Sequence, residues 1–130
     1  PLVATHSNAH SVCQSSRNLS DRQLRAIGET GGMAGLNFAT CFLRPDGKDS
    51  TEMTLDPVKA HIDHMLKFAG EDHVGIGSDY DGASTPGPIG GAEGLPVLIG
   101  AMREMGLGEA LIQKIAHGNW LRLLERTWGA

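Results

Sequence analysis

The chain has 130 residues, a net charge of −4 at pH 7 with neutral histidines and a sequence pI near 5.8. This length allows one modest domain with a hydrophobic core, and the acidic balance excludes nucleic acid or an anionic membrane as a charge-driven partner. No apolar stretch approaches the roughly 20 residues that a membrane-spanning helix needs, and no signal-peptide pattern opens the chain.

The first predicted elements are a strand and a helix. Apolar residues predict a strand over 2–5, which ends beside His6. The run Ser20-Asp-Arg-Gln23 has the form of a capping box, so we expect a helix over about 20–29. This order places His6 at the carboxyl end of the strand, with a loop between it and the helix.

A second strand and a longer helix follow. Residues 33–38 are short and apolar enough for a strand that is buried on both faces, and polar turn residues occupy 44–50. We expect the next helix over about 55–69, capped by Thr54 and ended by Gly70. Its apolar residues form one stripe: Val58, Ile62, Met65, Leu66 and Ala69.

The third strand is the most informative segment. Residues 75–82 read Gly-Ile-Gly-Ser-Asp79-Tyr-Asp-Gly, a glycine-rich strand that ends in an acidic loop. A Pro/Gly loop over 83–91 precedes a helix over about 95–105. A helical region over about 109–126 closes the chain, and we expect Gly118-Asn119 to divide it.

Strands that alternate with helices predict βαβ units with parallel strands, and therefore an α/β fold. Three such units do not close a barrel of eight, so the chain is either a small open layer or the last part of a larger barrel. The start at Pro1, inside an apolar strand-like run, indicates a cut or a processed end. We treat residues 1–130 as one segment.

Active-site residues of parallel α/β folds gather at the carboxyl ends of the strands, so Asp79 and His6 are the first candidates for a functional site. Asp79 fits a metal-binding or proton-transferring carboxylate and equally a turn or cap residue, and spacing does not decide between them. His6 fits a zinc ligand, although a lone histidine is more often structural. Arg17 fits a clamp for a substrate carboxylate or, alternatively, a salt bridge or a helix-end contact.

Other polar residues receive structural interpretations. His61 and His64 lie mid-helix, so we interpret them as helix surface with hydrogen bonds behind the site. Cys13 and Cys41 lack metal or redox spacing, and we interpret them as small buried residues, with a single disulfide as the alternative.

Six runs in order resemble the membrane dipeptidase (renal dipeptidase) family of zinc metallopeptidases, which are amidohydrolase-like (β/α)₈ TIM barrels. These runs are Thr5-His-Ser-Asn-Ala9, Arg17-Asn-Leu-Ser-Asp21, Gly35-Leu-Asn-Phe38, His61-Ile-Asp-His64, Gly75-Ile-Gly-Ser-Asp-Tyr-Asp-Gly82 and Gly118-Asn-Trp-Leu-Arg122. Together they cover nearly the whole chain. The resemblance implies that this chain is the C-terminal portion of such a barrel, about three βα units.

The resemblance also implies roles for the three candidates. His6 would be a zinc ligand at the end of the sixth barrel strand, and Arg17 would hold the terminal carboxylate of a dipeptide substrate. Asp79, after the eighth strand, would move protons beside two Zn²⁺ ions whose bridging hydroxide attacks the scissile carbonyl. The remaining family zinc ligands belong to the first five strands, so we expect the isolated chain to be inactive.

Two other interpretations remain open at this stage. One is a complementing subunit without catalysis, because unpaired strand edges favour a homo-oligomer or an N-terminal companion chain. It also fits another hydrolase of the same barrel class, such as a lactonase or a deaminase. The compartment is left open, with the cytoplasm favoured over secretion or a lipid anchor.

Overall fold

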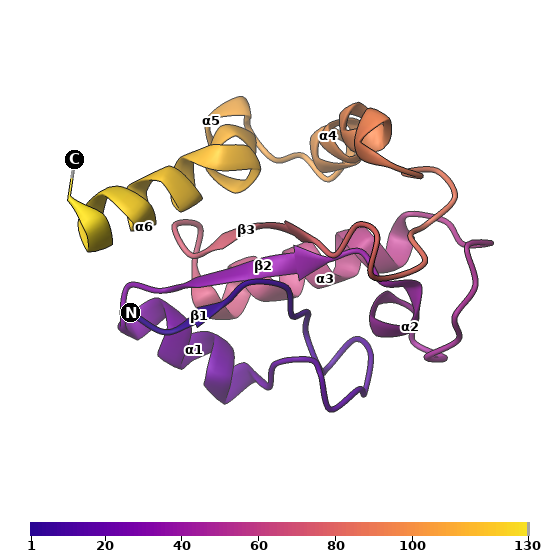
Figure 1. The fold of residues 1–130 in the computed structure, drawn as a ribbon, viewed down its shortest axis with the longest axis horizontal. Helices are drawn as coiled ribbons and strands as arrows, with labels where there is room; N and C mark the ends of the chain where they lie inside the picture. The colour runs from indigo at the N-terminus through magenta and orange to yellow at the C-terminus, as the bar shows by residue number, and fades with distance from the viewer. Residues whose placement is uncertain (130) are drawn as a thin grey trace.

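The computed structural model describes residues 1–129. Its centre is a parallel three-stranded sheet in the order β1-β2-β3, with helices between and after the strands (Figure 1). The strands are β1 (Val3–Ala4), β2 (Met33–Asn37) and β3 (Val74–Ser78). The parallel βαβ arrangement predicted from the sequence is confirmed. β1 is shorter than predicted, because only Val3 and Ala4 pair with β2.

Three helices lie between the strands: α1 (Asp21–Glu29), α2 (Thr40–Leu43) and α3 (Asp56–Ala69). The capping box is present, since the Ser20 hydroxyl accepts from the Gln23 N–H and the Gln23 side chain accepts from the Ser20 N–H. The predicted cap of α3 is wrong by one residue. Leu55 occupies the cap position, and the Thr54 hydroxyl accepts the Asp56 N–H at 3.3 Å. The short α2 was not predicted from the sequence.

The C-terminal third is helical and lies above the strands in the view of Figure 1. Its elements are η1 (Ala92–Gly94), α4 (Leu95–Glu104), α5 (Glu109–Gln113), the π-helical turn η2 (Lys114–Gly118) and α6 (Asn119–Trp128). The predicted division at Gly118-Asn119 coincides with the boundary between η2 and α6, although both residues keep helical dihedral angles and the helical path is not broken. A π turn absorbs the irregularity instead. None of the helices within residues 1–129 has the length and apolar character to cross a membrane.

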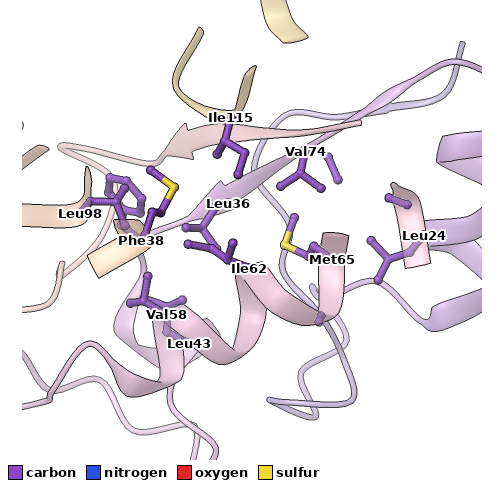
Figure 2. Packing of buried hydrophobic residues seen from close by; sticks show 14 of the residues in the cluster. Leu24, Leu36, Phe38, Leu43, Val58, Ile62, Met65, Val74, Leu98 and Ile115 are labelled. Atoms are coloured by element: carbon purple, nitrogen blue, oxygen red, sulfur yellow. The ribbon is translucent and has the colours of Figure 1, made fainter. Parts of the chain in front are cut away.

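Part of the core lies between the sheet and α3, and Leu98 and Ile115 from the C-terminal helical region extend it, as Figure 2 shows. The predicted apolar stripe of α3 is confirmed, with Val58, Ile62 and Met65 fully or almost fully buried. They pack with Leu36 and Phe38 from the segment that starts at β2. Each side chain of this size contributes roughly 1.5–3 kcal/mol on burial, so this contact fixes β2 relative to α3.

An irregularity interrupts the sheet near its carboxyl end. Leu36 pairs with Ile76 and Asn37 pairs with Ser78, so Gly77 is an extra residue in β3. A Cβ atom on Gly77 would lie 2.1 Å from the Thr5 carbonyl oxygen, and one on Gly35 would lie 2.0 Å from it. Only glycine permits this close approach, which brings the carboxyl ends of all three strands together.

Candidate functional site

The carboxyl ends of the strands supply three polar side chains to one edge of the sheet. His6 follows β1, Asn37 is the last residue of β2, and Asp79 follows β3 directly. Arg17 lies in the loop between β1 and α1. The sequence predicted His6 and Asp79 at this edge, and β2 adds a third residue that the prediction did not include.

Asn37 connects the other two residues. Its fully buried side chain donates through Nδ2 to the His6 carbonyl oxygen at 3.2 Å and to Asp79 Oδ2 at 3.1 Å. Its Oδ1 accepts the Ala39 N–H at 2.7 Å. The sequence alone did not mark Asn37 as a site residue, although it lies within the run Gly35-Leu-Asn-Phe38. The available signal was a primary amide at the end of an otherwise apolar strand.

His6 is half-buried, and one ring nitrogen is already engaged. Its Nδ1 lies 2.7 Å from the Thr5 hydroxyl, a hydrogen bond that fixes the ring orientation. Within residues 1–129, Nε2 makes no hydrogen bond. An imidazole held through one nitrogen with the other available is the usual arrangement of a histidine metal ligand.

Asp79 lies on unusual backbone. Ser78, Asp79 and Asp81 have φ angles of 45°, 76° and 65°, in the left-handed region that non-glycine residues rarely adopt. The Gly82 N–H closes this turn onto the Asp79 carbonyl oxygen at 3.2 Å. Such strain persists where the surroundings fix it, and it clusters at functional sites.

Arg17 is exposed, and its guanidinium carbon lies 5.3 Å from the centre of the Phe42 ring. Arg17 makes no ion pair within the described part of the chain, so the structure does not show the salt bridge that was the alternative to a substrate clamp. The neighbouring Asn18 is buried, and its Nδ2 donates to the carbonyl oxygens of Cys13 and Phe42 at 3.0 and 2.9 Å. The loop is therefore fixed while the charged group remains available for an anion.

The buried residues Asn8, Asn18 and Asn37 form what we call the asparagine cluster. Asn8 and Asn37 exchange two hydrogen bonds: the Asn37 N–H donates to Asn8 Oδ1 at 2.8 Å, and Asn8 Nδ2 donates to the Asn37 carbonyl at 2.9 Å. The Asn8 N–H donates to Asn18 Oδ1 at 3.2 Å. The cluster thus connects the Arg17 loop to the strand ends that carry His6 and Asp79.

The histidines of α3 lie outside this site. The prediction that His61 is helix surface is wrong, because it is fully buried. Its Nδ1 accepts the Ala9 N–H at 3.1 Å, and its Nε2 donates to the Leu43 carbonyl at 2.9 Å. Burial lowers the pKa of His61 to about 4. It therefore remains a neutral support between the loop after β1 and the end of α2.

His64 is partly exposed and pairs with α1. Its Nε2 lies 2.6 Å from Asp21 Oδ1, and the Ser11 hydroxyl donates to the same oxygen at 3.1 Å. The hydrogen bond from His64 is the main reason that the pKa of Asp21 lies below its ordinary value. This contact joins two helices and has no direct link to the strand ends.

The two cysteines are free thiols. Cys13 is buried and donates from Sγ to the Cys41 carbonyl oxygen at 3.4 Å, whereas Cys41 is half-buried. Burial raises the pKa of both thiols. The interpretation as small buried residues holds fully for Cys13 and only partly for Cys41.

The residues present fit zinc in type but not in number. An imidazole and a carboxylate are common zinc ligands, and a catalytic zinc ion takes three protein ligands. Residues 1–129 contain no group of three or more His, Cys, Asp or Glu side chains that could hold a metal ion. Within the described residues, His6 and Asp79 alone therefore do not complete a zinc site of this kind.

Comparison with protein families identifies the chain. The model of the membrane dipeptidase family, peptidase family M19, matches residues 1–128. The chain belongs to this family. The family is described as that of membrane dipeptidase.

Relatives show the same likeness over different shares of their length. An uncharacterized protein in the pqqA 5′ region of Klebsiella pneumoniae is 47% identical over 128 residues, which cover 98% of this chain and 47% of that protein. The crystal structure of dipeptidase AC, a metallopeptidase of family M19, is 59% identical with a TM-score of 0.98, covering 100% of this chain and 38% of that one.

A second solved structure of a similar chain contains a ligand. It is a metallopeptidase from Rhodobacter sphaeroides, liganded with a phosphinate mimic of the dipeptide L-Ala-D-Ala. It is 59% identical with a TM-score of 0.97, over 98% of this chain and 36% of that chain. Our M19 chain thus spans less than half the length of each of these three relatives.

Proposed function

We propose that this chain supplies part of the active site of a zinc-dependent dipeptidase, as the C-terminal three-strand portion of a (β/α)₈ barrel. The observation that supports the proposal is the Asn37 amide, which hydrogen-bonds both the His6 main chain and the Asp79 carboxylate at one sheet edge. In parallel α/β sheets and barrels this edge carries the chemistry.

Each residue then has a separate role. His6 would hold a zinc ion through Nε2, while the Thr5 hydroxyl keeps the ring oriented. Zinc, when bound, supplies an activated water and polarises the scissile carbonyl. The Asp79 carboxylate would take a proton from the attacking water and return it to the leaving amine. The Arg17 guanidinium would pair with the terminal carboxylate of the dipeptide through two parallel hydrogen bonds.

The test is hydrolysis of L-Ala-D-Ala and L-Ala-L-Ala by the complete zinc-loaded protein that contains these residues. We expect Asp79→Asn to lower kcat by about 10²–10⁴-fold, the range for losing a general acid–base group. Asp81→Asn is the matched control, because Asp81 is exposed in the same turn and also has a positive φ. Equal activity of the Asp79 and Asp81 variants would exclude a catalytic role for Asp79.

A second candidate function is that of a complementing subunit without activity of its own. Leu2 and Val3 at the outer edge of β1 are 51% and 46% exposed, and they line an apolar groove with Leu19 and Ile27. An edge strand with exposed apolar residues favours pairing with another strand. Native mass spectrometry separates the cases: a companion chain with zinc supports complementation, whereas zinc-dependent turnover by these 130 residues alone contradicts it.

A further inference from the structure

We infer that Asn37 is a positioning residue for the Asp79 carboxylate, an inference that rests on the proposed dipeptidase function. Within residues 1–129, the Asn37 amide is the only group that donates a hydrogen bond to the side chain of Asp79, at 3.1 Å to Oδ2. An aspartate with a single donor keeps its orientation only if that donor is itself rigid. The orientation of the Asp79 carboxylate therefore depends on how firmly Asn37 is held.

Every polar atom of Asn37 is engaged. Its main-chain N–H and carbonyl form the reciprocal pair of hydrogen bonds with the Asn8 side chain, at 2.8 and 2.9 Å. Its Oδ1 accepts the Ala39 N–H at 2.7 Å, and this contact decides which end of the amide is oxygen. Nδ2 must then face Asp79, so the amide cannot rotate without losing all three of its side-chain hydrogen bonds.

The same Nδ2 also donates to the His6 carbonyl oxygen at 3.2 Å. One buried amide thus sets the spacing between the residue proposed to hold zinc and the residue proposed to move the proton. A rigid link of this kind serves catalysis because a displacement of about 1 Å between reacting groups can cost about 100-fold in rate. The backbone at Asp79 is strained, and such a conformation persists only where neighbouring groups hold it in place.

The chain contains a matched control in Asn119. This asparagine is also fully buried, and its Nδ2 also donates to two oxygens, the carbonyls of Glu71 and Val74 at 2.8 and 2.9 Å. It lies at the amino end of β3, whereas Asn37 acts at the carboxyl end. Asn37→Asp and Asn119→Asp make the same isosteric exchange of a donor for an acceptor at the two ends of one strand.

The experiment measures kcat and KM for L-Ala-D-Ala in the complete zinc-loaded protein, together with urea unfolding of each variant. We expect Asn37→Asp to lower kcat by about 100-fold with KM changed by less than about threefold, while Asn119→Asp keeps kcat within about threefold. A loss of kcat below about threefold in Asn37→Asp, or equal losses in the two variants at matched stability, would overturn the inference. If Asn37→Asp does not fold, Asn37→Ser replaces it, with Asn119→Ser as control.

A second measurement does not depend on activity and separates this inference from the proposed function. In the 130-residue chain without ligand, the Gly82 N–H donates to the Asp79 carbonyl and reports on the turn. We expect its hydrogen exchange to accelerate by about tenfold or more in Asn37→Asp relative to Asn119→Asp. If the wild type hydrolyses no dipeptide but this difference appears, the function fails and the positioning stands. Equal exchange in both variants contradicts the positioning.

Discussion

The burial of His61 predicts a specific loss of stability in mild acid. The ring accepts a main-chain N–H at Nδ1 and donates to a carbonyl at Nε2, so it is held as one neutral tautomer. A second proton would have to enter at Nδ1, against the Ala9 N–H, inside the core. The pKa of His61 in the folded chain is therefore lowered to about 4, from an ordinary value of 6.5.

The sign and size of the effect follow from these two values. The unfolded chain takes up a proton at His61 as the pH falls through 6.5, whereas the folded ring stays neutral until about pH 4. The contribution is thus complete above pH 6.5 and is lost between 6.5 and 4. Its full size is about 3 kcal/mol, and about 2 kcal/mol of it disappears between pH 7 and pH 5.

The assay is urea unfolding at pH 7 and pH 5, for the wild type and for His61→Gln. Glutamine can also accept an N–H and donate to a carbonyl, but it does not titrate. The difference in unfolding free energy between the two proteins isolates His61 from the other histidines and the carboxylates. We expect this difference to shrink by about 2 kcal/mol from pH 7 to pH 5. A difference that is the same at both pH values would refute the reasoning.

Three further predictions concern the site and the sheet. Arg17→Ala should raise KM for free dipeptides by about 10–100-fold and leave KM for C-terminally amidated dipeptides unchanged. The control is Arg22→Ala, at an exposed residue of α1, which should change KM for neither substrate. Gly35→Ala should destabilise by about 1–3 kcal/mol or more in urea unfolding, because its Cβ would lie 2.0 Å from the Thr5 carbonyl oxygen. Gly100→Ala, with no atom within 4 Å, should instead stabilise α4 by about 0.5–1 kcal/mol. Zinc removal by a chelator should abolish hydrolysis by the complete protein and leave the urea midpoint of the 130-residue chain unchanged, because residues 1–129 hold no closed metal cluster.

Local physics explains why most elements could be predicted. The capping box at Ser20, the apolar stripe of α3 and Gly70, whose φ is 96°, depend on residues within a few positions of one another. The error at Thr54 is of the same local kind, since both Thr54 and Leu55 precede the helix and only one can adopt the cap conformation. The four-residue α2 gave no pattern, because one helical turn is too short to show periodicity.

The sequence by itself determined the order of parallel βαβ units, the family through its motifs, and the placement of His6 and Asp79 after strands. Only the tertiary structure decided which side chains meet. Asn37 and Asp79 are 42 residues apart, and they come into contact because β2 and β3 pair in parallel with an extra residue at Gly77. From the sequence, His61 is also expected at the helix surface. In the structure, the loop after β1 and the end of α2 cover it. Hydrogen bonds between distant segments depend on packing, which no local pattern encodes.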